Sequence, residues 1–127
     1  MAHNGQEHSI LVVDDHETNI DLISRILRRT DYKVLTAFDG VEALRVLETH
    51  TPSMIISDVM MPNMDGMELL QQVRLNGNLN GVPFVFVSAK GTREDIAAGL
   101  ALGADDYLTK PFRPQEFLAT VRRIIEG

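Results

Sequence analysis

The chain has 127 residues, and its 12 Lys and Arg against 18 Asp and Glu give a formal charge of −6 at pH 7. That length fits one domain with a buried core, and the acidic excess argues against direct binding of nucleic acid or an anionic membrane surface. No apolar run reaches the roughly 20 residues of a membrane-spanning helix, and the polar residues 1–8 carry no secretory signal. The lack of cysteine excludes disulfides and thiolate metal sites, and it favours a cytoplasmic location.

Short apolar runs alternate along the chain with segments whose apolar residues recur at helical spacing. In chain order the runs are Ile10–Val13, Val34–Ala37, Met54–Ile56, Phe84–Val87 and Tyr107–Leu108. Runs of this length bounded by turn residues predict strands buried on both faces, as in parallel sheets. The helical stripes that follow them are Ile20, Ile23 and Leu27; Val41, Leu44 and Leu47; Leu69, Leu70 and Val73; Ile96 and Leu100, a weaker stripe; and Phe117, Val121 and Ile124.

Residues typical of helix ends support the same alternation. The predicted starts are Asp39 followed by Glu42, Asp65 followed by Glu68, Thr92, and Pro114, and the predicted stops are Gly77 and Gly103. Five strand–helix repeats predict an α/β fold, in which right-handed crossovers place helices on both faces of a parallel sheet. We expect one domain over residues 9–127, a flexible segment over residues 1–8, and no output domain after the fifth helix.

Polar residues that can carry chemistry follow four of the predicted strands. They are Asp14 and Asp15, Asp58, Ser88, and Lys110. Sites in open α/β sheets form beyond the carboxyl ends of the strands, so we expect these side chains to converge. Three neighbouring carboxylates repel one another unless a cation offsets them, and Mg²⁺ prefers oxygen ligands of this kind. A carboxylate can also accept a phosphoryl group as a nucleophile, a transfer that needs mainly positioning and charge neutralisation.

Each of these residues alone is also explained by turn formation or helix capping, so the inference depends on the whole set. The four histidines lack metal-ligand spacing and are expected on the solvated surface. Among them, His16 directly follows the acid pair and is the one candidate for the rim of the site.

The order of these residues resembles that in the receiver domain of two-component response regulators. The resemblance runs from about Ile10 to Ile125, and its motifs are Asp14-Asp15; Asp58-Val-Met-Met-Pro62-Asn-Met-Asp65-Gly66; Ser88-Ala89; and Gly103-Ala-Asp-Asp-Tyr107-Leu-Thr-Lys110-Pro111-Phe112. It implies a flavodoxin-like (βα)5 fold with a five-stranded parallel sheet in the order 2-1-3-4-5. Each motif then falls at the end of a strand.

The resemblance also implies a phospho-acceptor and a metal site. Asp58 would accept the phosphoryl group, and Lys110 would pair first with Asp58 and then with the phosphoryl oxygens. Mg²⁺ would be bound directly by Asp15, Asp58 and the backbone carbonyl of Met60, and Asp14 would act through water. The Lys110–Pro111 bond is expected to be cis, since X-Pro is the common place for a cis bond.

The resemblance implies that two further residues respond to phosphorylation. Ser88 would donate its hydroxyl to the attached phosphoryl group, and Tyr107 would follow it between exposed and buried rotamers. The readout would be the face of the fourth helix, fifth strand and fifth helix, which would control an output domain or a partner protein. Charged residues of that face would form ion pairs in a homodimer or remain solvated; they are Arg93, Glu94, Asp95, Asp105, Asp106, Arg113, Arg122 and Arg123.

The implied phosphoryl donor is a phosphohistidine on a sensor histidine kinase or on a histidine phosphotransfer protein. Met60 and Lys90 stand two residues after Asp58 and Ser88, at positions that in this family adjust how fast water reaches the acyl phosphate. Apolar Met60 offers no hydrogen bond to orient that water, so we expect slow intrinsic dephosphorylation.

Two alternatives keep part of this chemistry. A Mg²⁺-dependent phosphohydrolase that forms an aspartyl phosphate typically has Asp-x-Asp, whereas Met60 stands two residues after Asp58 and the chain lacks room for a substrate cap. A receiver-like interaction module that no longer takes phosphate would not need the complete set of acids, hydroxyl and ammonium. Dinucleotide binding is excluded, because no Gly-x-Gly-x-x-Gly follows Val13.

Overall fold

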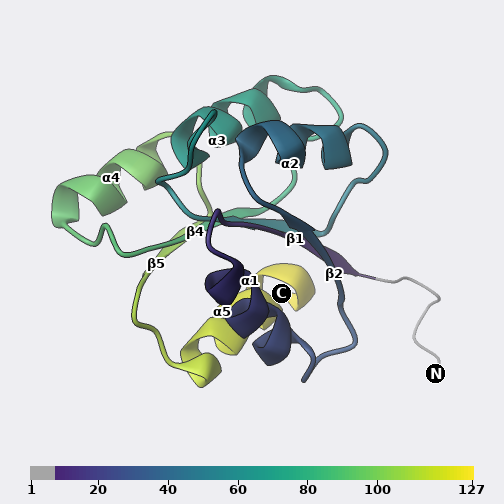
Figure 1. The fold of residues 1–127 in the computed structure, drawn as a ribbon, viewed down its shortest axis with the longest axis vertical. Coiled ribbons are helices and arrows are strands. Elements are labelled where there is room, and N and C mark those ends of the chain that lie inside the picture. Colours follow the sequence, from purple (N-terminus) through teal and green to yellow (C-terminus); the bar gives the residue numbers. More distant parts are fainter. Residues whose placement is uncertain (1–7) are drawn as a thin grey trace.

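The computed structural model describes residues 8–127, in which five strands alternate with five helices (Figure 1). The strands are β1 (Ser9–Val13), β2 (Lys33–Ala37), β3 (Met54–Ser57), β4 (Phe84–Ser88) and β5 (Asp106–Thr109). The helices are α1 (Glu17–Leu27), α2 (Gly40–Leu47), α3 (Gly66–Leu75), α4 (Arg93–Ala101) and α5 (Pro114–Glu126). Of the segment predicted to be flexible, residues 1–7 lie outside the described residues. His8 is described, and its carbonyl accepts the N–H of Lys33 over 2.8 Å.

The strands form one parallel sheet in the order β2-β1-β3-β4-β5, which confirms the predicted fold class and strand order. The register pairs Val13 with Ser57 and Ser88 with Thr109, so the carboxyl ends of β1, β3, β4 and β5 lie along one edge. The residues that directly follow these strands therefore meet at that edge.

Two hydrophobic cores lie on the two faces of the sheet. Alternate residues of β1 point to opposite sides, so Leu11 and Val13 belong to one core and Ile10 and Val12 to the other. Figure 1 shows α2, α3 and α4 covering the first face and α1 and α5 covering the second. Every one of these four β1 residues is at most 1% exposed. This burial on both faces explains the continuous apolar run in the sequence.

The prediction that all strands are buried on both faces is wrong for β2. Val34 and Leu35 are only half-buried and Thr36 is exposed, because β2 is an edge strand. The stripe predicted for the fourth helix is also only partly buried, since Leu100 is 44% exposed. Gly99 is the buried residue of α4, and a Cβ there would lie 3.0 Å from the ring of Tyr107. Helix α4 thus contacts the sheet through its backbone at a glycine.

Helix starts follow the predicted capping residues. The side chains of Asp39, Asp65 and Thr92 each accept a backbone N–H three residues on, and Pro114 is the first residue of α5. Gly103 ends α4 with φ of +108°, a conformation that favours glycine. Gly77 does not end α3. That helix ends at Leu75, and the next residue, Asn76, has an extended backbone.

Arg74, in the last turn of α3, joins the α3–β4 loop and the α4–β5 loop through its guanidinium. It donates to the carbonyls of Gly103 (2.8 Å), Val82 (2.7 Å) and Asn80 (3.1 Å), and it pairs with the carboxylate of Asp105 at 3.2 Å. The same Asp105 oxygen accepts the N–H at the start of β4. A planar group with several fixed donors suits this arrangement of acceptors.

Replacing Arg74 with methionine should lower the free energy of unfolding by about 3 kcal/mol, because the loop carbonyls and Asp105 lose a charged hydrogen-bond donor. Lysine at this position should recover only part of the loss, since an ammonium has no fork of donors. Urea unfolding followed by circular dichroism measures both, with exposed Arg93→Met as the matched control. Equal midpoints for Arg74→Met and Arg93→Met would contradict this role.

Candidate functional site

The acidic residues of the site are placed by two neighbouring strands. Asp14 follows β1 and Asp58 follows β3, and the N–H of Asp58 donates to the carbonyl of Val13 over 3.0 Å. Asp14 is 2% exposed and Asp58 is 8% exposed. Two carboxylates this deeply buried require charged or hydrogen-bonding partners.

Lys110 supplies a partner for both carboxylates. Its Nζ lies 3.1 Å from Asp14 Oδ2 and 3.0 Å from Asp58 Oδ2. Burial opposes the charged form, but the hydrogen bonds to Asp58 and Asp14 outweigh it and raise the pKa of Lys110 above its usual value. The N–H of Lys110 donates to the carbonyl of Ser88 at the end of β4, and the Lys110–Pro111 bond is cis, as predicted.

The second oxygen of Asp58 faces the loop that follows it. Asp58 Oδ1 accepts the N–H of Val59 over 2.6 Å and lies 3.4 Å from the N–H of Met60. The N–H of Gly66 donates to the carbonyl of Val59 over 2.8 Å, which holds the start of the loop against the first turn of α3. The side chain of Asp58 is therefore fixed at both oxygens.

Asp15 and His16 complete the acidic cluster at the end of β1. The side chain of His16 is 66% exposed, and its Nδ1 lies 3.2 Å from Asp15 Oδ1 and 3.4 Å from Asp14 Oδ1. Ligand atoms of these three residues lie within 4.8 Å of one another. His16 is thus both a surface residue and a neighbour of the acids, and the signal in the sequence was its position directly after the acid pair.

Asn19 is a neighbour of the site that the sequence pattern does not single out. Asn19 lies in the first turn of α1, and its side-chain amide is 3.4 Å from Asp14 Oδ1. With the backbone N–H of His16 and the ammonium of Lys110, Asp14 accepts from three donors. Nothing in the local sequence around Asn19 distinguishes this contact from an ordinary helix-surface position.

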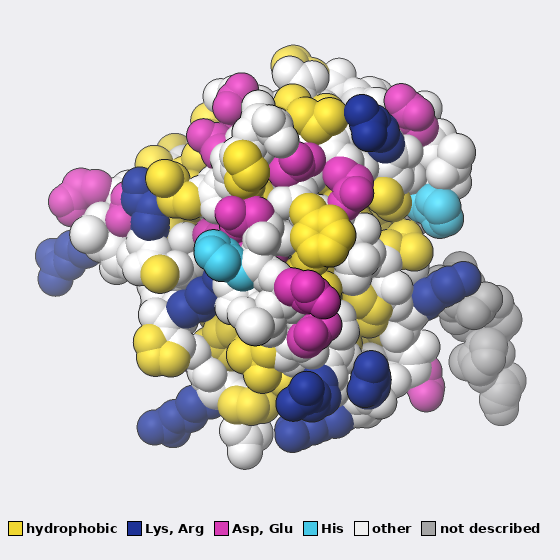
Figure 2. Space-filling view, viewed as in Figure 1, with side chains coloured by type: hydrophobic (Ala, Val, Ile, Leu, Met, Phe, Trp, Pro, Cys, Tyr) yellow, Lys and Arg dark blue, Asp and Glu magenta, His cyan; other side chains and the backbone are white. Residues whose placement is uncertain are grey.

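The donor set fits a hard divalent cation. The carboxylates of Asp14, Asp15 and Asp58 offer oxygen atoms, and Lys110 links Asp58 to the cluster at the end of β1. Mg²⁺ is usually held by one or two carboxylates together with water and a phosphate oxygen. Figure 2 shows acidic side chains gathered near the middle of one face, with Lys and Arg mostly toward its lower and left edges.

Ser88 and Tyr107 lie next to each other behind this edge. Ser88 is buried at the end of β4, and its Oγ accepts the N–H of Lys90 over 3.2 Å. Tyr107 is buried against Phe86, and its hydroxyl donates to the carbonyl of Lys90. Burial raises the pKa of Tyr107, and a hydrogen bond with Ser88 acts in the opposite direction. The loop after β4 is therefore held by both residues.

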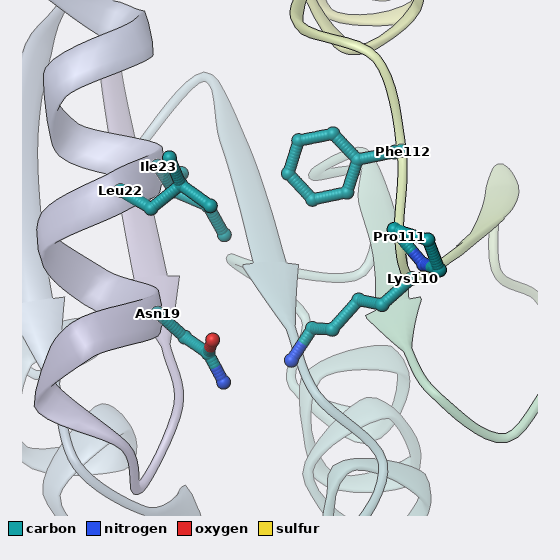
Figure 3. Close-up of a pocket in the computed structure, with 6 residues that line it drawn as sticks. All are labelled: Asn19, Leu22, Ile23, Lys110, Pro111 and Phe112. Carbon is teal, nitrogen blue, oxygen red and sulfur yellow. The ribbon is translucent and has the colours of Figure 1, made fainter.

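A pocket of about 340 Å³ opens beside Lys110, between α1 and the loop after β5. Figure 3 shows the ammonium of Lys110 and the amide of Asn19 pointing toward the same opening, with Phe112 projecting toward α1. The lining residues are Asn19, Leu22, Ile23, Lys110, Pro111 and Phe112. An apolar groove thus leads up to the cation that contacts Asp58.

The predicted readout face already contains ion pairs within the chain. Arg123 pairs with Asp106 at 2.8 Å, and Lys90 lies 3.9 Å from Asp95. Asp105 is engaged by Arg74. These acids therefore have partners in the single chain. Within residues 8–127, no helix combines the length and the apolar character needed to cross a membrane.

A protein-family model described as the response regulator receiver domain matches residues 10–122 of the chain. The chain belongs to the response regulator receiver family. This confirms the resemblance inferred from the sequence and places the chain in phospho-accepting two-component signalling. The matched residues include every position of the site from Asp14 to Lys110.

Individual response regulators are similar to this chain in sequence or in structure. The alkaline phosphatase synthesis transcriptional regulatory protein PhoP of Bacillus subtilis is 46% identical over 116 residues, which are 91% of this chain and 48% of that protein. Chemotaxis response regulator CheY4 of Vibrio cholerae is 34% identical with a TM-score of 0.87, over 94% of this chain and 99% of that one.

The receiver domain of sensor histidine kinase PA1611 from Pseudomonas aeruginosa, solved with a magnesium ion coordinated in its active-site cleft, is 30% identical with a TM-score of 0.87. That match covers 96% of this chain and 100% of the other. The chain spans about half the length of the curated relatives it matches.

Proposed function

We propose that Asp58 is the residue that accepts the phosphoryl group, and that residues 9–127 form the receiver domain. The observation that carries this proposal is the position of Lys110 Nζ, 3.0 Å from Asp58 Oδ2 and 3.1 Å from Asp14 Oδ2. A cation beside a fixed carboxylate neutralises the charge that develops when a phosphoryl group approaches. Asp58 lies beside this cation at the carboxyl end of the sheet.

The metal proposed for the site is Mg²⁺, held by Asp15, Asp58 and the backbone carbonyl of Met60, with Asp14 acting through water. When bound, Mg²⁺ supplies positive charge that offsets the carboxylates and the phosphoryl oxygens. The chemistry of the donor set supports this choice, as does the magnesium ion in the similar receiver domain of PA1611. The role of the Met60 carbonyl stays a prediction.

In the proposed transfer, a carboxylate oxygen of Asp58 forms a bond to phosphorus while the bond from phosphorus to the imidazole nitrogen of a phosphohistidine breaks. The electron pair of the broken bond stays on the imidazole, which leaves as the neutral ring if its other nitrogen carries a proton and otherwise takes a proton from solvent. Lys110 keeps its proton throughout and transfers its hydrogen bond from Asp58 to a phosphoryl oxygen. The products are an aspartyl phosphate and a free histidine on the donor.

The switch that follows is proposed to involve Ser88 and Tyr107. The hydroxyl of Ser88 would turn from the loop after β4 to donate to a phosphoryl oxygen, and Tyr107, which is buried in the structure, would follow it between exposed and buried rotamers. New contacts of this kind bias an existing equilibrium between two loop positions. The altered face would be that of α4, β5 and α5.

The proposed partners follow from the same site. A sensor histidine kinase or a histidine phosphotransfer protein would place an apolar side chain in the groove of Leu22, Ile23 and Phe112 and its phosphohistidine next to Asp58 (Figure 3). An output domain, a partner protein or a second copy of the chain would contact the face of α4, β5 and α5. We propose a cytoplasmic location and no catalysis beyond phosphorylation and dephosphorylation of Asp58 itself.

One experiment separates this switch from a phosphohydrolase. The chain is incubated with acetyl phosphate and Mg²⁺, and protein-bound phosphoryl groups and released inorganic phosphate are followed together. The proposal predicts that uptake reaches at most one phosphoryl group per chain and that a chelator abolishes it. Rapid multiple turnover without a phosphorylated protein would contradict the switch and favour the hydrolase.

Replacing Met60 with asparagine should speed the loss of the phosphoryl group by about tenfold, because an amide can hold the attacking water. Met60 is 59% exposed, so the change leaves the core untouched. The decay of phosphorylated protein after removal of the donor measures the effect, with exposed Leu75→Asn as the control. An unchanged decay rate would show that residue 60 does not control water access.

A further inference from the structure

The loop after Asp58 is connected to the turn that begins α2 by two hydrogen bonds. The side-chain amide of Asn63 donates to Asp39 Oδ2 over 2.7 Å. The N–H of Gly40 donates to the carbonyl of Met64 over 3.2 Å, and a Cβ on Gly40 would lie only 2.7 Å from Met64 Cγ. We call these two contacts, Asp39 with Asn63 and Gly40 with Met64, the loop brace.

Asp39 has two roles, one for each oxygen. Its Oδ1 accepts the N–H of Glu42 over 2.8 Å and caps α2, while its Oδ2 accepts from Asn63. These hydrogen bonds, first that from Glu42 and then that from Asn63, lower the pKa of Asp39. Helix capping needs only one oxygen, so the contact with Asn63 is an additional interaction.

Asn63 is suited to its position in a second way. Its φ is 68°, and among the residues described it is the only one other than glycine with a positive φ. Asparagine tolerates this left-handed conformation better than most residues. The position therefore combines a backbone conformation that few residues adopt with a side-chain donor aimed at Asp39.

The brace acts on the second half of the loop. Asp58 Oδ1 and the hydrogen bond from Gly66 to Val59 fix the start of the loop. Met60, whose side chain is exposed, lies between that start and Asn63. Met61 and Met64 pack against the core from partly buried positions, and the brace adds the hydrogen bonds that join this part of the loop to the β2–α2 turn.

We propose that Asp39 and Asn63 are positioning residues that hold the loop in the shape that presents the Met60 carbonyl to Mg²⁺. The inference rests on the proposed function, in which that carbonyl is a metal ligand. Residues that orient metal ligands typically change metal affinity when they are lost. The β2–α2 turn, which contributes no ligand itself, thereby supports the metal site.

The test measures Mg²⁺ binding by isothermal titration calorimetry in the intact chain. Asn63→Gly keeps the positive φ and removes the amide, and Asn63→Asp sets a second carboxylate against Asp39. The exchange variant, Asn63→Asp with Asp39→Asn, restores one amide donor and one carboxylate acceptor, and asparagine still caps a helix. Asp15→Asn removes a proposed metal ligand and serves as the reference for a damaged site. Urea unfolding without metal establishes that each variant is folded.

Asn63→Gly should weaken Mg²⁺ binding by about tenfold, the lower end of what supporting partners contribute. Asn63→Asp should weaken it at least as much, and the exchange variant should return toward the wild-type affinity, which a general loss of stability would not produce. If Asn63→Gly binds Mg²⁺ with wild-type affinity while Asp15→Asn loses binding, the loop brace does not support the metal site. The proposed function would not be affected by that result. Unchanged binding in Asp15→Asn would overturn the proposed metal site, and the brace with it.

Discussion

Lys110→Met should slow phosphoryl uptake from acetyl phosphate by about 100-fold or more, as expected when a preorganised charged donor is removed from a reacting centre. Lys110 is the cation that contacts both Asp14 and Asp58, and within residues 8–127 it is the one Lys or Arg paired with either of them. Methionine fills a similar volume without the charge. Initial rates of protein phosphorylation at saturating Mg²⁺ measure the loss.

The same substitution should lower the free energy of unfolding without metal by about 3 kcal/mol, because two buried carboxylates lose their counter-ion. Hydrogen bonds raise the pKa of Lys110 in the folded state above the unfolded value of about 10.4. Its contribution is therefore fully present below that unfolded pKa and is lost as the pH rises through the raised folded pKa. The stability difference between wild type and variant should be constant near neutral pH and should shrink in strong alkali.

Lys33→Met is the matched control, since Lys33 is exposed at the opposite end of the sheet. It should change neither the uptake rate nor the alkaline part of the stability curve. If the Lys110→Met variant is phosphorylated as fast as the Lys33→Met variant, the ammonium of Lys110 does not assist phosphoryl transfer.

Gly66→Ala should be the most damaging small substitution near the site. A Cβ at Gly66 would lie 2.1 Å from the carbonyl oxygen of Asp58 and 3.0 Å from the ring of Phe86, so the backbone at the end of β3 must move. Such overpacking should lower the free energy of unfolding by about 3 kcal/mol. Displacement of Asp58 should also slow phosphoryl uptake by about 100-fold, because reacting groups are sensitive to misplacement by an ångström.

Gly77→Ala provides the comparison for Gly66→Ala. A Cβ at Gly77 has open space around it, so the same change of residue should leave uptake unaffected and stability equal or slightly higher. Denaturant unfolding and the rate of phosphoryl uptake, measured on both variants, test this difference. Equal behaviour of the two alanine variants would show that the close approach of α3 to Asp58 is not required.

The sequence was sufficient to predict the sheet and the convergence of the site. Continuous apolar runs identify buried parallel strands, and the residue directly after each run must lie at the carboxyl edge. For this reason the order of residues along the chain predicts that Asp14, Asp58 and Lys110 meet. The structure shows the contacts that such a pattern implies, with Lys110 between the two acids.

Features that depend on packing between distant segments could not be predicted in this way. The burial of α4 through Gly99 follows from the shape of the surface made by Phe86 and Tyr107, which no local pattern encodes. The contact of Asn63 with Asp39 joins residues 24 positions apart, and each of them has an ordinary local explanation as a turn or cap residue. Edge strand β2 likewise has an apolar run whose partial exposure depends on its place in the sheet.

Intact-protein mass spectrometry with peptide mapping shows whether Asp58 itself takes the phosphoryl group. After incubation with acetyl phosphate and Mg²⁺, the wild-type chain should gain about 80 Da, the mass of one phosphoryl group, on the peptide that contains Asp58. Asp58→Asn should gain nothing under the same conditions. A gain of the same size in Asp58→Asn, or a modified peptide from another part of the chain, would show that Asp58 is not the acceptor.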